Sequence, residues 1–278
     1  MLPVWIVFLF SFVALTTQAQ EKRTHEFFPP KKVIFPGLVA DPWETQASIF
    51  SINKYRFLGK IGNAIPLYRA TWTPPLAQEM EIVQLDLDLL SYNLMRFRKE
   101  EGGGFDLDTS DTKFGLALNH KGKSWDHRLS LEHMSAHLAD GQLWPTVKRS
   151  KQGYSREFLQ FNISKNFTYG KPHLGIHYIF SNRHPEKYEN KQFFNLQWGG
   201  EIFYPLSKIF SLMTAADWQA KQEYHFFISQ SYFAGVRIHG SYEAPVKAAF
   251  QYYTGYDPRG EFYNVKTHYW GFGLQYFI

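Results

Sequence analysis

The chain has 278 residues, a net charge of +5 and a pI near 9.1. It has no cysteine, which excludes disulfides, thiol catalysis and cysteine-ligated metals. Its positive charges are scattered and no nucleic-acid-binding motif accompanies them, so we expect no nucleic-acid partner. Aromatic residues make up 18% of the chain, which is typical of a membrane barrel with aromatic girdles rather than of a soluble core.

The first 19 residues are typical of a cleaved export signal. Their apolar run of about 14 residues is too short to cross a bilayer as a helix. Thr17 and Ala19 are the small residues that signal peptidase prefers, so we predict cleavage after Ala19. An uncleaved anchor is the alternative, because no Lys or Arg precedes the apolar run. Residues 20–45, rich in proline and charge, are predicted to form a non-barrel N-terminal arm.

Residues 46–278 alternate between apolar and polar or small side chains, with turn-rich segments between the alternating runs. The clearest run is HYWGFGLQYFI at 268–278, and others lie at 83–90, 112–120, 193–204 and 246–253. Side chains on a strand alternate between its two faces, so each run predicts one lipid-facing side. A soluble sandwich also alternates, but it does not need aromatic residues on one parity of nearly every strand.

The alternation therefore predicts an antiparallel transmembrane β-barrel of about 12 strands in the bacterial outer membrane. The final strand resembles the signal that the outer-membrane insertion machinery reads. Asp86 and Asp88 are expected to face the lumen, alone or in a charge network with Arg128 and Glu132. So few strands filled with charged side chains leave a narrow lumen, which excludes a wide general porin.

The stretch LEHMSAHLADG at 131–141 carries the residues with the most chemistry. Strand parity places His133, Ser135 and His137 on the outward face, where hydrocarbon gives way to headgroups. His133 and His137 would be about 13 Å apart, too far to bind one metal ion, so we expect no metal and no cofactor. A simpler interpretation is that these residues and Asp140 form a polar rim against headgroups and loops.

A nucleophilic site fits the spacing better than a metal site does. The Cα atoms of His133 and Ser135 would lie about 6.6 Å apart on one face, close enough for a hydroxyl–imidazole contact. A serine needs such a base, and the base needs a group that orients it. Glu157 faces outward at the start of the next antiparallel strand and can supply that group. Such a set would lie where the acyl esters of phospholipid and lipid A are found.

Two resemblances add to this interpretation. Residues 35–46, 133–141, 154–157 and 252–277 resemble the outer-membrane family named domain of unknown function 1207, which implies a barrel but no activity. The His-x-Ser on a barrel strand resembles outer-membrane phospholipase A and lipid A 3-O-deacylase. That resemblance implies Ser135 as nucleophile, His133 as base and Glu157 as orienting group. Those enzymes have Asn after the serine, whereas this chain has Ala136, and their gap to the third residue is shorter.

The sequence is therefore compatible with two functions. The sequence favours a structural or narrow-pore barrel, and the alternative is a membrane-embedded serine hydrolase. Both make outer-membrane phospholipid and lipopolysaccharide the surrounding partners, and neither fixes the oligomeric state.

Overall fold

A computed structural model of the chain describes residues 23–30, 34–35, 37–53, 56–74, 79–98, 103–139, 154–183, 192–239 and 245–276. The predicted signal peptide, Asp140 and the last two residues lie outside these ranges. The strands are β1 (Thr24–Phe27), β2 (Ala47–Ile52), β3 (Arg56–Trp72), β4 (Glu81–Phe97), β5 (Phe105–Lys121), β6 (Trp125–Leu138), β7 (Tyr154–Lys165), β8 (Gly170–Arg183), β9 (Phe193–Pro205), β10 (Phe210–Lys221), β11 (Phe227–Ile238), β12 (Val246–Tyr256) and β13 (Lys266–Tyr276). Two 3₁₀ turns, η1 (Gln222–Tyr224) and η2 (Gly260–Phe262), follow β10 and β12.

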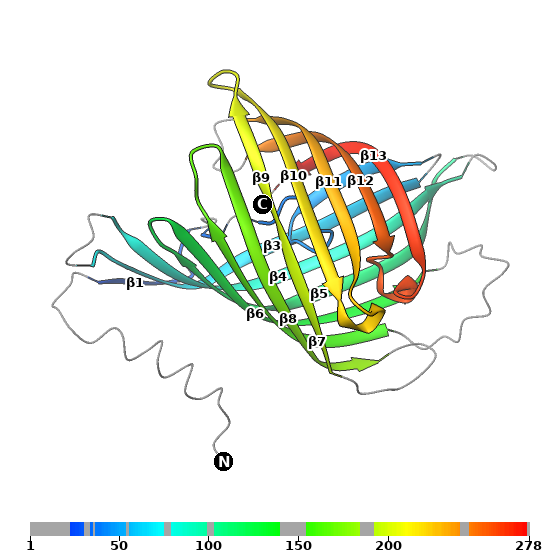
Figure 1. Cartoon of the computed structure of the whole chain (residues 1–278), viewed down its shortest axis with the longest axis horizontal. Helices are drawn as coiled ribbons and strands as arrows, with labels where there is room; N and C mark the ends of the chain where they lie inside the picture. Colours follow the sequence, from blue (N-terminus) through cyan, green and yellow to red (C-terminus); the bar gives the residue numbers. More distant parts are fainter. Residues whose placement is uncertain are drawn as a thin grey trace, which may run out of the picture.

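Twelve strands, β2 to β13, form a closed antiparallel barrel (Figure 1). Each strand pairs with the next, and the barrel closes where β13 pairs with β2, with Leu274 opposite Ile49. The predicted barrel fold is therefore confirmed. In the described part of the chain, no helix is both long and apolar enough to cross a membrane. One strand is additional: β1 lies on the free edge of β3, with Thr24 opposite Thr71, within the segment predicted to be an arm.

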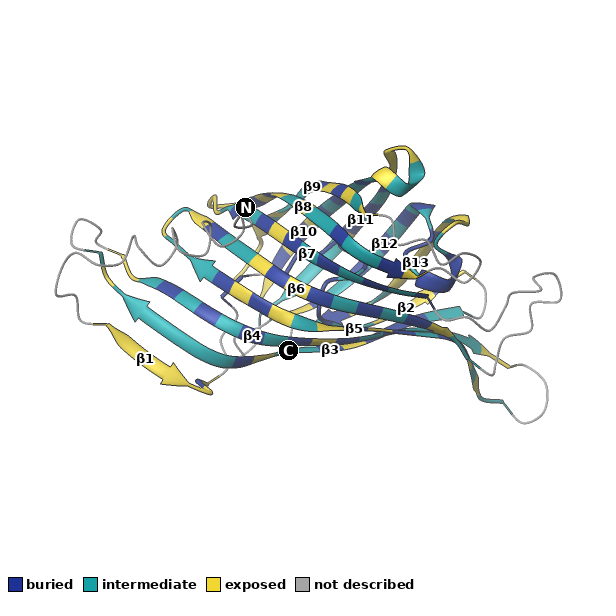
Figure 2. Ribbon diagram, turned by 90° about the horizontal axis from the view of Figure 1, so that it is seen from below, coloured by how far each residue is buried: buried dark blue, intermediate teal, exposed yellow. Residues whose placement is uncertain are grey.

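The barrel strands show the expected alternation between a lipid-type outer face and a polar interior. On β4, Gln84, Asp86 and Asp88 are buried while Leu89 is exposed. Figure 2 shows the resulting banding of buried and exposed positions along neighbouring strands. The outer face carries many large exposed apolar side chains, which is the arrangement that a hydrocarbon solvent requires.

The barrel interior is filled by residues 37–46, which we call the lumenal segment. Its backbone enters the barrel just before β2, and Val39 and Ala40 are among its buried residues. The amide of Gln275 donates to the Val39 carbonyl at 3.0 Å, which fixes the segment against β13. At the other side, the Trp43 indole donates to the Pro258 carbonyl at 2.8 Å, next to η2. The segment is thus tied to the barrel at two points.

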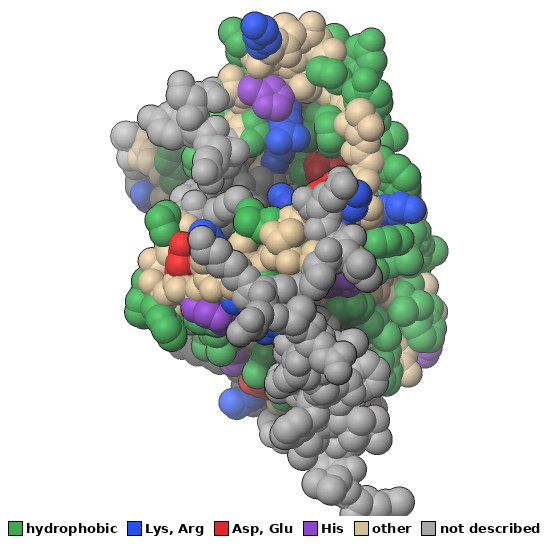
Figure 3. Space-filling model, turned by 90° about the vertical axis from the view of Figure 1, so that its left-hand side faces the viewer, with side chains coloured by type: hydrophobic (Ala, Val, Ile, Leu, Met, Phe, Trp, Pro, Cys, Tyr) green, Lys and Arg blue, Asp and Glu red, His purple; other side chains and the backbone are tan. Residues whose placement is uncertain are grey.

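The two ends of the barrel differ in the length of their connections. At one end the connections are residues 73–80, 122–124, 166–169, 206–209 and 239–245, none longer than eight residues, and we call it the short-turn end. At the other end they include residues 139–153, 184–192 and 257–265, and we call it the long-loop end. Figure 3 looks onto the left-hand side of the barrel in Figure 1, which is the short-turn end.

Candidate functional site

The candidate site lies on the outer face of β6 near the long-loop end. Because β6 alternates regularly, His133, Ser135 and His137 all point outward, while Met134 and Ala136 between them are buried. The apolar side chain that precedes them on this face, Leu131, is half exposed. The polar side chains of His133, Ser135 and His137 therefore lie next to an apolar, lipid-type surface on the same face of β6.

The structure brings His133 and Glu157 into contact. The two residues are opposite each other in the β6–β7 ladder, and His133 Nδ1 lies 3.0 Å from Glu157 Oε1. Their side chains are 30% and 34% exposed, so the pair is reachable from outside the barrel. The ring of Phe114 packs against His133 with the centroids 4.9 Å apart. With Nδ1 engaged by the carboxylate, Nε2 is the nitrogen that His133 can present to another group.

Ser135 forms its side-chain hydrogen bond with His137 rather than with His133. Its Oγ lies 2.8 Å from His137 Nε2. The predicted catalytic residues are thus brought together only in part. His133 and Glu157 are in contact, whereas Ser135 lies on the same face but forms its hydrogen bond with His137. His137 was assigned only to the polar rim, although its parity with Ser135 was a signal that the two side chains could meet.

Hydroxyl groups continue on both sides of Ser135 at the same level of the barrel. Ser91, Thr112, Ser135 and Ser155 are successive partners across β4, β5, β6 and β7. The Thr112 hydroxyl donates to the Ser135 carbonyl at 3.4 Å. This cross-strand row makes the outer face polar at one level, and sequence reasoning strand by strand did not reveal it.

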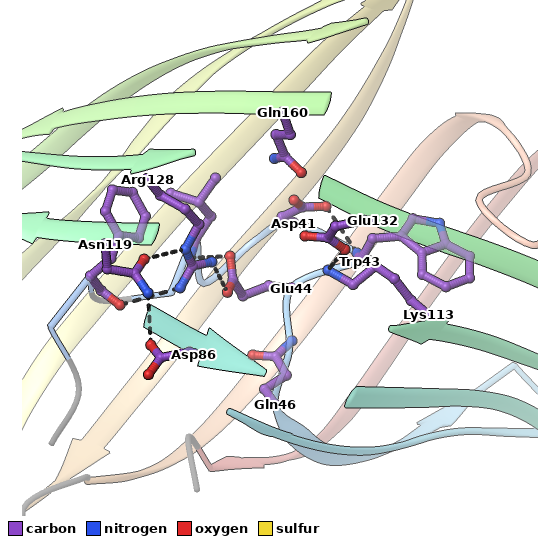
Figure 4. Close-up of polar contacts among 12 residues, drawn as sticks. Asp41, Trp43, Glu44, Gln46, Asp86, Lys113, Asn119, Arg128, Glu132 and Gln160 are labelled. Atoms are coloured by element: carbon purple, nitrogen blue, oxygen red, sulfur yellow. Dashed lines mark hydrogen bonds and ion pairs between the residues drawn. The ribbon is translucent and has the colours of Figure 1, made fainter. Parts of the chain in front are cut away.

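A second cluster of functional groups lies inside the barrel (Figure 4). Arg128 donates to Glu44 Oε1 at 2.8 Å and, through Nε, to Asn119 at 2.9 Å, while Asn119 donates to Asp86 at 2.7 Å. Although burial raises it, the pKa of Glu44 is lowered below its ordinary value by the guanidinium of Arg128. A lumenal network that contains Asp86 and Arg128 is therefore present, as predicted. The carboxylate paired with Arg128, however, is that of Glu44 in the lumenal segment.

Two further ion pairs lie in the barrel interior. Lys113 and Glu132 form an ion pair at 2.8 Å, and Arg156 pairs with Glu223 at 3.0 Å. Between these pairs remains a cavity of about 50 Å³, which has room for water but for no larger solute. Among the described residues, no group of three or more His, Asp and Glu is placed to hold a metal ion.

Comparison with known proteins supports the fold. Residues 19–278 match the model of a family described as a protein of unknown function, DUF1207. The outer membrane phospholipase A from Escherichia coli superposes with a TM-score of 0.50 at 17% identity, covering 86% of this chain and 94% of that one. The calcium-bound dimer of the Salmonella typhi outer membrane phospholipase gives a TM-score of 0.52 at 13% identity, with coverage of 85% and 91%. No curated protein matches the sequence. The chain thus has the fold of an outer-membrane barrel.

Proposed function

Since this chain belongs to the DUF1207 family of proteins of unknown function, we propose its activity from the site itself: hydrolysis of lipid acyl esters within the outer membrane. The observation that carries the proposal is the outward Ser135 hydroxyl, 2.8 Å from one imidazole and on the same face as a second imidazole paired with a carboxylate. The similarity in fold to outer membrane phospholipase A supports a barrel whose outer face meets lipid.

The level of the site selects the substrate. Outer-membrane barrels have short periplasmic turns and longer extracellular loops. Ser135 lies near the end of β6 that leads into residues 139–153, so it faces the outer leaflet. The substrates we propose are therefore the acyl esters of phospholipid or lipid A in that leaflet. The proposal includes export with residues 1–19 cleaved and insertion through the final strand by the outer-membrane machinery.

The catalytic roles follow from the positions along β6. Ser135 attacks the ester carbonyl carbon, and its proton passes to His133 Nε2, since Glu157 holds Nδ1. His133 then protonates the departing alcohol, and water releases the fatty acid from the acyl-serine by the reverse proton path. His137 holds the hydroxyl in the resting state. A change of the serine side chain between staggered rotamers transfers the hydroxyl from His137 to His133, because the two histidines flank it symmetrically at i−2 and i+2.

The test is fatty-acid release by refolded protein from mixed outer-membrane lipids, with and without calcium. Ser135→Ala and His133→Ala should lower the rate by several orders of magnitude, because an essential nucleophile or base is lost. Ser91→Ala is the matched control for the serine, since Ser91 lies in the same hydroxyl row without a histidine beside it. His127→Ala is the control for the histidine, because His127 faces outward on the same strand and stacks on Phe161.

The outcomes separate the roles. If His137→Ala removes the activity and His133→Ala does not, His137 is the base and the assignment of His133 is wrong. If wild-type protein releases no more fatty acid than Ser135→Ala, the hydrolase proposal fails. The competing structural or narrow-pore function would then stand, and stable ion steps in a planar bilayer would identify a pore. The filled lumen leads us to expect no such steps.

A further inference from the structure

A basic pocket opens at the short-turn end of the barrel, away from Ser135. Its volume is about 440 Å³, within the range of small-molecule sites. We call it the mouth pocket and define it by Phe203, Ser207, Lys208, Ser211, Arg237 and His239, which line it. Figure 3 shows a histidine beside basic side chains (Lys or Arg) around a hollow at this end.

The register of the strands explains why these side chains meet. On β10, Ser211 is opposite Pro205 of β9 on one side and Arg237 of β11 on the other, so the three share the inward face at the rim. Lys208 lies in the β9–β10 turn, between Pro205 and Ser211 in the sequence, and His239 directly follows β11. The pocket is therefore built by the ends of three neighbouring strands and by the β7–β8 and β9–β10 turns, and its strand residues lie on the inward face of the barrel.

Among the residues that the structure describes, no ion pair is seen for the two cations of the pocket. None of the described residues that line the pocket is Asp or Glu. Within the described part of the chain, Arg237 Nε is buried without a hydrogen-bond acceptor, and its guanidinium is seen only over the Phe203 ring, at 5.6 Å from the centroid. Elsewhere in the barrel interior, Arg128 and Arg156 each meet a carboxylate. Arg237 as a whole is only partly buried, but a buried guanidinium nitrogen ordinarily has an acceptor, so an anion in the pocket would supply a missing contact.

The acid that lies two residues from Phe203 on β9 is engaged elsewhere. Glu201 interacts electrostatically with Lys171 and Lys247. Burial and the nearby charge of Arg237 together lower the pKa of His239 below its ordinary value. An anion placed between these groups would relieve this repulsion.

The hydroxyl groups of the pocket can donate to that anion. Ser211 Oγ lies 2.9 Å from His239 Nε2, so an ordered hydroxyl–imidazole pair faces the guanidinium. Ser207 Oγ accepts the N–H groups of Ile209 and Phe210 at 3.1 and 3.0 Å, which leaves its own O–H to be donated. Two cations and two hydroxyl groups that line one pocket are the kind of donor set that binds a phosphate group.

We propose that the mouth pocket binds a phosphate monoester group. The volume holds the phosphate together with an organic part of about the size of glycerol or a sugar, which would pack on Phe203. The group can come from a soluble phosphate ester or from a lipid headgroup, and both present the same oxygens to Arg237 and Lys208. This proposal is independent of hydrolysis at Ser135, which lies toward the long-loop end and on the outer face.

The test is a calorimetric titration of refolded protein in an uncharged detergent, at constant ionic strength. The probes are inorganic phosphate, glycerol 3-phosphate and dihexanoylphosphatidic acid below its micelle concentration. Wild-type protein should bind all three in competition. Arg237→Gln and Lys208→Gln should each weaken binding about tenfold or more, as expected for the loss of a charge-assisted contact. Lys208 is in an exposed turn, so its variant keeps the test valid if Arg237→Gln does not fold.

The matched control is Lys123→Gln, which makes the same charge change at the same end of the barrel. Lys123 already faces Glu79 at 3.4 Å, so its loss should leave phosphate binding within about twofold of wild type. Tighter binding of the lipid than of glycerol 3-phosphate identifies a headgroup, and equal binding identifies a soluble ester; both support the site. The proposal is overturned if wild-type protein shows no saturable binding at millimolar phosphate. It is also overturned if Lys123→Gln weakens binding as much as Arg237→Gln.

Discussion

Replacing Glu44 by Gln should loosen the lumenal segment from the barrel wall. Glu44 joins the segment to β6 through Arg128 Nη1 at 2.8 Å, and its second oxygen accepts the Leu38 N–H at 2.9 Å. The two ionic side chains are 4% and 11% exposed. The substitution keeps the shape and an acceptor for Leu38, but it leaves the charge of Arg128 buried without its counter-ion.

The magnitude follows from that burial. Removing one partner of a buried ion pair typically costs about 3–5 kcal/mol. We take the lower figure of about 3 kcal/mol, because glutamine can still accept the Leu38 hydrogen bond. Each 1.4 kcal/mol is a tenfold change in an equilibrium constant, so the population with the segment released should rise roughly 100-fold.

The absence of cysteine makes this population measurable. Ala40 is only 2% exposed, and Ala40→Cys introduces one thiol that reacts only when the segment is released. The rate of thiol labelling in this background then reports the release equilibrium, and Glu44→Gln should raise it roughly 100-fold. Glu79→Gln is the control, because its pair with Lys123 is 52% and 68% exposed and a surface pair contributes little. A labelling rate that Glu44→Gln leaves within a factor of about five of the parent would refute the reasoning.

Three further predictions concern the same architecture. Acid should release the lumenal segment. Arg128 lowers the pKa of Glu44 against the effect of burial. The ionised Glu44 therefore stabilises the segment fully above its ordinary pKa of 4.5, and this stabilisation is lost as the pH falls through the lowered pKa. In the Ala40→Cys background, the acid-induced rise in thiol labelling, followed with a disulfide reagent that reacts at low pH, should therefore disappear when Glu44→Gln is added. Gly62→Ala should displace the segment too, because its Cβ would lie 2.7 Å from the Gln46 nitrogen, and the yield of protease-resistant barrel should fall. Purified protein should migrate differently on gels before and after heating, as closed barrels do; identical mobility would contradict the closed wall.

The sequence predicted the barrel because each strand carries its own two-residue period. Leu87 and Asp86 show this on β4: one faces outward, and the other is buried and bonded to Asn119. That information is local, so it survives without knowledge of neighbouring strands. The same period placed His133, Ser135 and Glu157 on the outer face, and it fixed their faces without fixing their rotamers.

Features that depend on several distant segments could not be predicted in this way. The lumenal segment has no strand period, and its burial follows from a match between its acids and groups on distant strands, as in Glu44 with Arg128 and Asp41 with Gln197. The preference of Ser135 for His137 is a rotamer choice between two histidines at the same spacing along the strand. The mouth pocket needs the registers of β9, β10 and β11 together before Arg237 and Ser211 can be placed side by side.

The pairing of β2 with β13 has a consequence for the order of assembly. These strands are the first and the last of the barrel, so their ladder requires nearly the whole chain to be in place, and contacts of such sequence separation form slowly. Gln46 ends the lumenal segment and Ala47 begins β2, so the filling and the sealing strand are one continuous piece of chain. The pairing of β2 with β13 and the insertion of the lumenal segment therefore take place together, late in assembly. A newly made barrel that has not yet sealed is also one whose buried cations, Arg128 first among them, still face water.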